Sequence, residues 1–245
     1  MGEGIPRGAG QLSTSPVSRP LAGERSGEVG VRDRPSRHLV YHELREALSE
    51  EGCALCRLRE RSVERYLQGL LYESVNDPGV REKLRASRGF CPRHTWQVRR
   101  LGGPLGVSIL WRDLLSQEAL LTGGPTGRRR GASGEHVCPA CAIASDAERR
   151  YLEELGEHLT TGDLRAEYEA SAGLCLPHVR LLARGTEQGR EYLLTVEREK
   201  VGRLREELSE IIRKHDYRFA AEPRGEEKDA WIRATRKLAG ERVTE

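Results

Sequence analysis

The sequence predicts an all-α protein built as a pseudo-symmetric tandem duplication of helical units, each clamped by a Cys-x-x-Cys/Cys-x-x-His site, plus a long helix and a short C-terminal helix. Apolar residues recur at helical spacing along most of the chain, and the strict alternation of a strand is nearly absent. Six cysteines and two histidines also form one arrangement twice, with 34 residues between Cys56 and Cys91 and 33 between Cys141 and Cys175.

The repetition extends beyond the cysteines. Arg65-Tyr66-Leu67 matches Arg150-Tyr151-Leu152, and the six residues that end at Cys91 match those that end at Cys175. The shift of about 85 positions is too long for the repeat of a solenoid protein. We therefore expect a pair of small related units.

Residues 1–35 are expected to be a disordered tail, because Gly, Pro, Ser and Arg dominate there and no apolar period appears. The tail lacks the apolar core of a signal peptide, and no stretch of the chain approaches the length needed to cross a bilayer. These features predict a cytoplasmic protein with no membrane partner. Thiols stay reduced in that compartment, so paired cysteines favour metal or redox chemistry over structural disulfides.

The first unit is expected over residues 36–121. An apolar stripe predicts a helix around residues 63–71, and Asp77-Pro78 can cap and begin the next helix. Gly89 suits the left-handed residue that closes that helix, and Pro92 suits the first turn of a third. This places Cys91 and His94 at a helix N-terminus. A strongly apolar helix from Leu105 to Leu121 completes the unit.

A glycine-rich linker is expected over residues 122–134, followed by the second unit over residues 135–219. The second unit repeats the stripe, with Gly173 in place of Gly89, and adds a long helix from Thr186 to Tyr217. The predicted near-heptad seam of that helix consists of Leu194, Val201, Leu204, Leu208 and Ile211, with a charged gap at Glu197. Residues 220–245 are expected as an extension whose helix, about Glu226 to Leu238, stops at Gly240.

Each unit contains the four thiolate and imidazole ligands that a structural zinc site needs. We expect one zinc ion per unit, held by Cys53, Cys56, Cys91 and His94 in the first and by Cys138, Cys141, Cys175 and His178 in the second. Because each unit is small and highly charged, metal binding would supply much of its folding energy. Cys91→Ser or Cys175→Ser is then expected to unfold its own unit.

Other interpretations of the cysteines remain open. An iron–sulfur cluster also uses thiolates and sometimes histidine. A thioredoxin-type redox pair would need a βαβ context that the sequence does not show, and small buried cysteines can simply pack helix ends. Thiol oxidation could also open the clamps and release the metal, which would make the protein a redox or metal-responsive sensor.

The remaining polar motifs are weaker. His136 lies close to Cys138, but Glu51 occupies the matching place in the first unit, and His38 and His42 lack a metal-binding pattern and are expected at the surface. A basic surface could contact nucleic acid, although acidic neighbours in space would neutralise it. Its residues are Arg81, Lys83, Arg85, Arg88, Arg93, Arg99 and Arg100, and Arg128 to Arg130 in the linker are similarly ambiguous.

The segment Lys214 to Phe219 is dense in titratable and aromatic residues. Adjacent residues of a helix point to different faces, so His215 and Asp216 do not predict a proton relay. We expect the segment to form a packing corner that anchors the helix of Trp231. An enzyme that uses His215, Asp216, Tyr217 and Arg218 is a third and weaker hypothesis, because no established catalytic motif accompanies them.

The paired Cys-x-x-Cys and Gly-x-Cys-x-x-His units, His215-Asp216-Tyr217-Arg218 and Trp231 to Ala234 together resemble a bacterial family of uncharacterised helical proteins with a domain of unknown function. The resemblance covers about residues 36 to 240 and implies a shared core, with no established activity. With a net charge of +3 and both signs interspersed, the chain favours a protein partner over nucleic acid. The predicted function is a zinc-stabilised interaction or regulatory scaffold.

Overall fold

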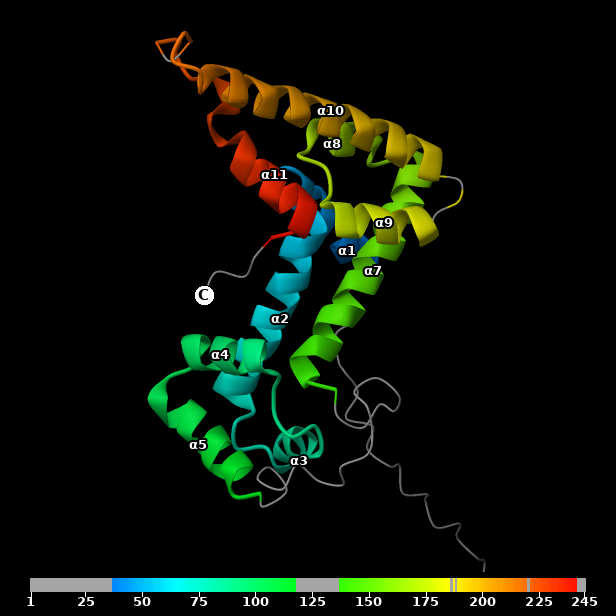
Figure 1. The fold of residues 1–245 in the computed structure, drawn as a ribbon. Coiled ribbons are helices and arrows are strands. Elements are labelled where there is room, and N and C mark those ends of the chain that lie inside the picture. Colours follow the sequence, from blue (N-terminus) through cyan, green and yellow to red (C-terminus); the bar gives the residue numbers. More distant parts are fainter. Residues whose placement is uncertain (1–36, 118–136, 186, 188, 220, 242–245) are drawn as a thin grey trace, which may run out of the picture. The chain divides into compact units, whose positions relative to one another are not determined.

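All regular elements that the structure describes are helices, which confirms the all-α prediction (Figure 1). The computed structural model describes residues 37–117, 137–185, 187, 189–219 and 221–241. Its helices are α1 (Arg37–Leu48), α2 (Ala54–Glu73), α3 (Pro78–Ala86), α4 (Pro92–Leu101), α5 (Pro104–Leu115), α7 (Pro139–Thr161), α8 (Arg165–Ala170), α9 (Leu176–Gly185), α10 (Arg190–Lys214), η2 (Glu226–Asp229) and α11 (Ala230–Ala239). The expected tail, the linker, Arg128 to Arg130 and His136 lie outside the described residues.

Helices α2 and α7 form the centre of the fold and pack against each other in opposite directions (Figure 1). Both carry the predicted apolar stripes, with Val63 and Leu67 of α2 and Tyr151 and Leu155 of α7 almost fully buried. The start of α2 shares one apolar cluster with the end of α7. The end of α2 shares a second apolar cluster with the start of α7.

Helices α3, α4 and α5 follow the C-terminal end of α2 and pack in the second of these clusters. The predicted start of α3 is confirmed, since the Asp77 carboxylate accepts a hydrogen bond of 2.8 Å from the Val80 amide. Gly89 has a φ of +83° as expected, and its amide donates back to the Leu84 carbonyl at 2.7 Å.

Helix α5 ends at Leu115, earlier than the predicted Leu121. The Ser116 hydroxyl donates a 2.7 Å hydrogen bond to the Asp113 carbonyl. Serine favours helix ends because such local bonds compete with helix continuation. Residues 118–121 lie outside the described residues.

Helix α1 was not anticipated, although Val40, Leu44, Ala47 and Leu48 form a stripe at helical spacing. All four are buried against α2 and its neighbours. His42 is exposed, as expected.

The long helix α10 is shorter than predicted at both ends, and its predicted seam is confirmed at Leu194, which packs against the core, but not at Val201. Its buried side chains are Leu193, Val196, Glu197 and Lys200, whereas Val201 is 39% exposed. The predicted charged gap at Glu197 is thus part of the buried face. Its carboxylate is paired there with Lys237 of α11, a partner that the local apolar pattern could not reveal.

The short C-terminal helix is confirmed as η2 and α11, and it stops at Gly240 with a φ of +86°. Helix α11 returns along α10 and packs on α9. In the part of the chain that the structure describes, no helix has the length and apolar character of a membrane span.

Candidate metal centres

The eight predicted ligands gather in two groups, but not in the expected ones. Cluster A consists of Cys53, Cys56, Cys175 and His178, and cluster B consists of Cys91, His94, Cys138 and Cys141. The grouping of four ligands within one unit is therefore wrong. Each Cys-x-x-Cys pair instead meets the Cys-x-x-His pair of the other half of the chain.

The length of the central helices explains this exchange. Cys53 and Cys56 lie at the start of α2, which has 20 residues and so extends about 30 Å. Helix α4, with Cys91 and His94, follows from the opposite end of α2. Because α7 runs antiparallel to α2, the start of α7, with Cys138 and Cys141, also lies at that opposite end.

Both clusters are built from helix N-termini. Cys53 and Cys138 are the N-cap residues of α2 and α7, with Cys56 and Cys141 in the first turns. In cluster B, Cys91 caps α4 and His94 lies in its first turn. Exposed amide groups and the helix dipole at such positions stabilise thiolate charge.

In cluster A, three sulfurs surround one imidazole nitrogen. His178 Nδ1 lies 3.3 Å from Cys53 Sγ, 3.4 Å from Cys56 Sγ and 3.0 Å from Cys175 Sγ. The sulfurs of Cys56 and Cys175 are 3.7 Å apart. All four residues are at most 4% exposed.

The surroundings of cluster A orient its histidine and cover its sulfurs. Glu148 of α7 contacts His178 Nε2 at 2.9 Å and also pairs with Arg59 of α2 at 3.1 Å. A carboxylate in this position fixes the imidazole so that Nδ1 faces the sulfurs. At the end of α11, a side-chain carbon on Gly240 would lie 3.2 Å from Cys56 Sγ, so the backbone itself closes over the cluster.

Cluster B has the same internal geometry. His94 Nδ1 lies 3.2 Å from Cys91 Sγ and 3.4 Å from the sulfurs of Cys138 and Cys141. The sulfurs of Cys91 and Cys141 are 3.7 Å apart. His94 and Cys138 are buried, whereas Cys91 and Cys141 are partly exposed.

The pKa values of the ligands indicate that each cluster would release protons when it binds a metal ion. Burial and the neighbouring Cys138 and Cys91 raise the pKa of Cys141 to about 12, so a positive charge is needed to hold all the sulfurs as thiolates. Burial and Arg93 lower the pKa of His94, which favours its neutral form. In His178, burial lowers the pKa, but hydrogen bonds to the three sulfurs raise it to about 12. A bound metal ion would take the place of these protons.

The distances fit a single tetrahedral ion. A metal–sulfur bond of about 2.3 Å places two sulfurs about 3.8 Å apart at the corners of a tetrahedron. The 3.7 Å separations match this value and are far too long for a disulfide. All six cysteines are free thiols, so each cluster offers three sulfurs and one nitrogen that can bind a metal ion.

Sequence reasoning missed three residues that complete these sites. Glu148 and Gly240 contact cluster A directly, and the buried Glu197 accepts a 2.9 Å hydrogen bond from the amide of Leu174, next to Cys175. Only the position of Gly240 as a helix stop was visible in the sequence. The contacts of Glu148 and Glu197 join residues that lie far apart in the chain.

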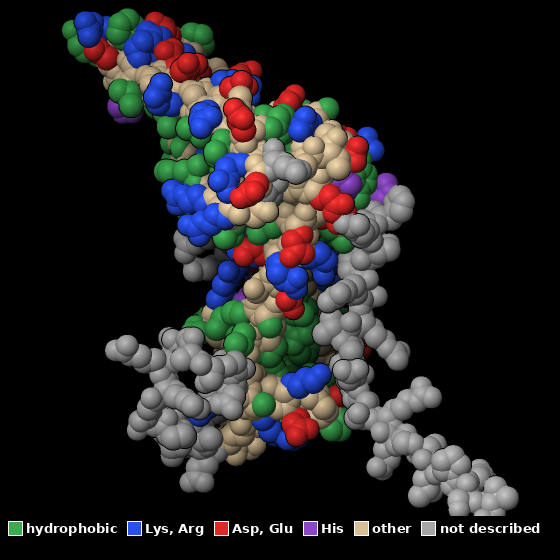
Figure 2. All heavy atoms as spheres, turned by 90° about the vertical axis from the view of Figure 1, so that its right-hand side faces the viewer, with side chains coloured by type: hydrophobic (Ala, Val, Ile, Leu, Met, Phe, Trp, Pro, Cys, Tyr) green, Lys and Arg blue, Asp and Glu red, His purple; other side chains and the backbone are tan. Residues whose placement is uncertain are grey.

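Three of the basic residues near the first Cys-x-x-His, Arg81, Arg85 and Arg93, form ion pairs with Asp113 and Glu60. Arg85 makes two 2.9 Å hydrogen bonds to Asp113, which lowers the pKa of that carboxyl, and Arg93 pairs with Glu60 at 2.7 Å. Figure 2 likewise shows acidic and basic side chains interspersed on one face of the molecule. A continuous cationic surface for nucleic acid is not supported by these pairs.

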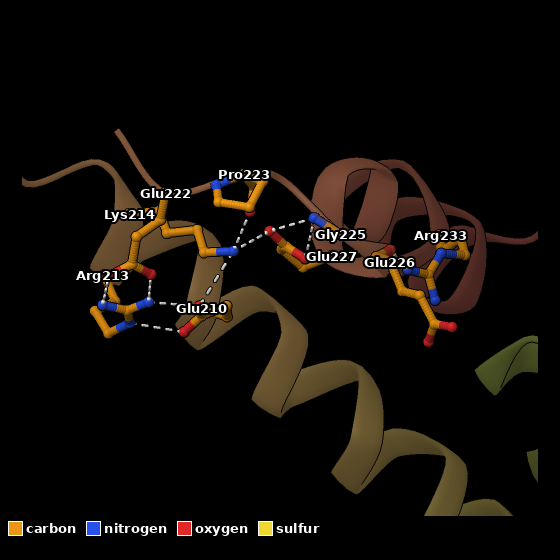
Figure 3. Close-up of polar contacts among 9 residues, drawn as sticks. All are labelled: Glu210, Arg213, Lys214, Glu222, Pro223, Gly225, Glu226, Glu227 and Arg233. Carbon is orange, nitrogen blue, oxygen red and sulfur yellow. Dashed lines mark hydrogen bonds and ion pairs between the residues drawn. The ribbon is translucent and has the colours of Figure 1, made fainter. Parts of the chain in front are cut away.

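The segment from His215 to Arg218 does not assemble a catalytic group. Asp216 pairs with Arg218 at 2.6 Å, His215 is exposed, and Tyr217 is 87% exposed. The expected packing corner is held instead by ion pairs. Arg213 pairs with Glu210 and Glu222, and Lys214 bonds to Pro223 and Glu227 (Figure 3).

Comparison with known proteins agrees with the resemblance noted from the motifs. The model of a family described as "Family of unknown function (DUF6062)" matches residues 38–120 and 129–245. The chain belongs to this family. It is also 26% identical over 206 residues to an uncharacterized 23.9 kDa protein in the xynA 3' region of Caldicellulosiruptor sp. (strain Rt8B.4), covering 80% of the chain and 98% of that relative.

No solved structure matches the chain significantly. The two clusters are therefore interpreted from their own geometry. Both take a Cys-x-x-Cys from the start of a long central helix and a Cys-x-x-His from the start of a ten-residue helix. This repeated construction agrees with a tandem duplication, which itself stays a prediction.

Proposed function

We propose that each cluster binds one zinc ion and that the two ions join the halves of the chain into a helical scaffold. The crosswise meeting of Cys-x-x-Cys and Cys-x-x-His is the observation that carries the proposal. Three sulfurs and one nitrogen within tetrahedral distances are the usual donors of structural zinc. An iron–sulfur cluster holds its ligands around several iron atoms, which fits these close sulfurs less well.

The scaffold function is supported by the closed form of the sites. Four protein donors fill a tetrahedron, so a substrate has no open coordination position. The Glu148 contact resembles the outer-shell support of zinc-binding histidines. We propose a cytoplasmic interaction or regulatory scaffold for a protein partner, in which the metal holds the helices and the surrounding surfaces bind. A redox or metal-responsive sensor is the second candidate, because two sulfurs of cluster B are partly exposed.

The first prediction tests metal binding and the exchange of ligands together. The double variant Cys56→Ser/Cys175→Ser removes two ligands from cluster A and should retain one zinc ion per chain. Cys56→Ser/Cys91→Ser removes one ligand from each cluster and should lose both ions or hold both weakly. Zinc content is measured by native mass spectrometry and elemental analysis of the full chain, purified under reducing conditions.

Wild-type protein with two tightly held zinc ions is the required reference. If it holds no zinc, the proposed function is wrong. If two ions are present but the outcomes of the two double variants are exchanged, the ligands are grouped within each half and the crosswise sites are wrong. Circular dichroism of each variant separates metal loss from general unfolding.

A further inference from the structure

We propose that the two clusters have different tasks: cluster A is a permanent structural site, and cluster B is an oxidation site at which a hydroperoxide joins Cys91 and Cys141 in a disulfide and releases the metal. This inference rests on the proposed binding of zinc. The two clusters have the same ligands and nearly the same distances. Their surroundings differ in three ways, and each difference makes cluster B the more reactive.

The first difference is access to the sulfurs. The cysteines of cluster A are at most 4% exposed. In cluster B, Cys91 and Cys141 are both partly exposed, while Cys138 and His94 are buried. A peroxide must contact sulfur to oxidise it, and susceptibility follows exposure and thiolate character. The two exposed sulfurs are therefore the expected points of attack.

The second difference is the support of the histidine. Glu148 contacts His178 in cluster A, and Arg59 pairs with that carboxylate. The residue that corresponds to Glu148 in the first half of the chain, at the shift of 85 that relates Cys53 to Cys138, is Val63, which is buried. A valine cannot orient an imidazole, and Glu60, the carboxylate near His94, accepts its hydrogen bonds from Arg93 and Gln97. Loss of such outer-shell support commonly weakens metal binding.

The third difference is the covering segment. The end of α11 places Gly240 against Cys56 and Cys175, and Glu241 Oε1 lies 3.4 Å from the Cys53 amide. These contacts close cluster A from the side of the C-terminal helix. Cluster B lies at the opposite ends of α2 and α7, where the starts of α4 and α7 supply its ligands.

The chemistry needs only the two exposed sulfurs and a hydroperoxide. One thiolate sulfur attacks the peroxide, an S–O bond forms and the O–O bond breaks, and the leaving oxygen takes a proton to give an alcohol or water. The second thiolate then attacks the sulfenic sulfur, an S–S bond forms, and hydroxide leaves and takes a proton to give water. The sulfurs lose two electrons and the peroxide gains two. Zinc leaves with its charge unchanged.

The position of the two sulfurs favours this disulfide. They are 3.7 Å apart, so a small movement brings them to bonding distance. Cys91 belongs to the start of α4 and Cys141 to the start of α7, so the disulfide keeps these helices tied after the metal has left. The buried His94 and Cys138 lose their shared ion. Oxidation would therefore change the local arrangement at the starts of α4 and α7 and leave the fold in place.

The test uses the full zinc-loaded chain, reduced and free of excess thiol. Hydrogen peroxide is added in steps, released zinc is measured with a chromogenic chelator, and disulfides are mapped by mass spectrometry. We expect one zinc ion to be released at a peroxide concentration about tenfold or more below that needed to release the second. A peptide pair joined through Cys91 and Cys141 should appear together with the first release. Reducing agent and zinc should restore the starting state.

Glu148→Ala supplies a second measurement, because it removes the support of His178 without touching a ligand. Loss of such support lowers metal affinity by about 10-fold to 100-fold, so zinc release from cluster A should approach that of cluster B. Glu153→Ala, on the exposed face of the same helix, is the matched control and should release zinc like the wild type.

Three results would overturn the proposal: simultaneous loss of both ions, earlier loss from cluster A, or a first disulfide that joins a different pair. Each of these can occur with two zinc ions bound at the start. In that case the structural role of zinc stands and only the division of tasks fails.

Discussion

At the scale of the residue, Glu197 links the metal centre to the C-terminal helices. It is 3% exposed and accepts hydrogen bonds from the Tyr168 hydroxyl and the Leu174 amide. Its other oxygen pairs with Lys237, whose side chain is 10% exposed. One carboxylate thus connects α8, the loop segment before Cys175, α10 and α11.

Glu197→Gln should destabilise the protein, because it leaves Lys237, whose side chain is 10% exposed, without its counter-charge. Breaking a buried ion pair by removing one partner costs about 3 to 5 kcal/mol. The free energy of unfolding, measured by urea denaturation of the zinc-loaded protein, should fall by about this amount. Glu199→Gln, at an exposed position of the same helix, is the control and should change stability little. Equal effects of the two substitutions would contradict the assigned role of Glu197.

At the scale of the element, the turn between α10 and α11 is held mainly by charges. Glu227 accepts a 2.9 Å hydrogen bond from Lys214 and further bonds from the Gly225 amide, and these contacts lower its pKa from 4.5 to about 2 (Figure 3). Arg213, and then Lys214, lower the pKa of Glu210 to about 2 as well. The large side chains nearby give little apolar support, since Ile212 and Tyr217 are 74% and 87% exposed.

This turn should be sensitive to acid. Both carboxyl groups have pKa values below their unfolded value of 4.5, so their contribution is complete above about pH 4.5 and is lost as the pH falls toward 2. The protection factors of the amides in residues 210–239, which correct for the intrinsic exchange rate at each pH, should fall in this range. Glu227→Gln should increase exchange there already at pH 7, and Glu226→Gln, at an exposed neighbouring position, should not. Equal protection factors for the wild-type turn at pH 7 and pH 3 would contradict this explanation.

At the scale of the whole molecule, each ligand cluster joins segments that lie far apart in the chain. Cluster A connects α2 to α9, and cluster B connects α4 to α7. Closing such long loops removes much of the conformational freedom of the unfolded chain. Apparent zinc binding of about 10 kcal/mol in small domains is effectively folding energy. Loss of either ion should therefore destabilise both halves of the chain.

Cys175→Ser and Cys91→Ser should therefore each loosen helices in both halves of the chain. Cys175→Ser should increase hydrogen exchange in α1, the start of α2 and α9, because the partners of Cys175 are Cys53 and Cys56. Cys91→Ser should do so in α4 and the start of α7. Exchange confined to the half of the chain that carries the substitution would restore the earlier expectation that each unit unfolds alone.

The sequence by itself predicted the candidate ligands and most of the helices. Cysteine and histidine spacing marks metal donors wherever the chain folds, and caps such as Asp77 and stops such as Gly240 act on neighbouring residues. The buried face of α10 was misassigned because Glu197 is neutralised by Lys237, 40 positions later. From the local apolar pattern alone, a charged residue such as Glu197 is predicted to be exposed.

Only the tertiary structure decided which half-sites meet. The two Cys-x-x-Cys pairs are chemically equivalent, as are the two Cys-x-x-His pairs, so their spacing fits either grouping. The antiparallel packing of α2 and α7 settles the choice, because a helix of about 30 Å separates the first Cys-x-x-Cys from the segment that follows it. The same packing places Glu148 against cluster A and leaves two cysteines of cluster B partly exposed, and so makes two sites of identical composition physically different.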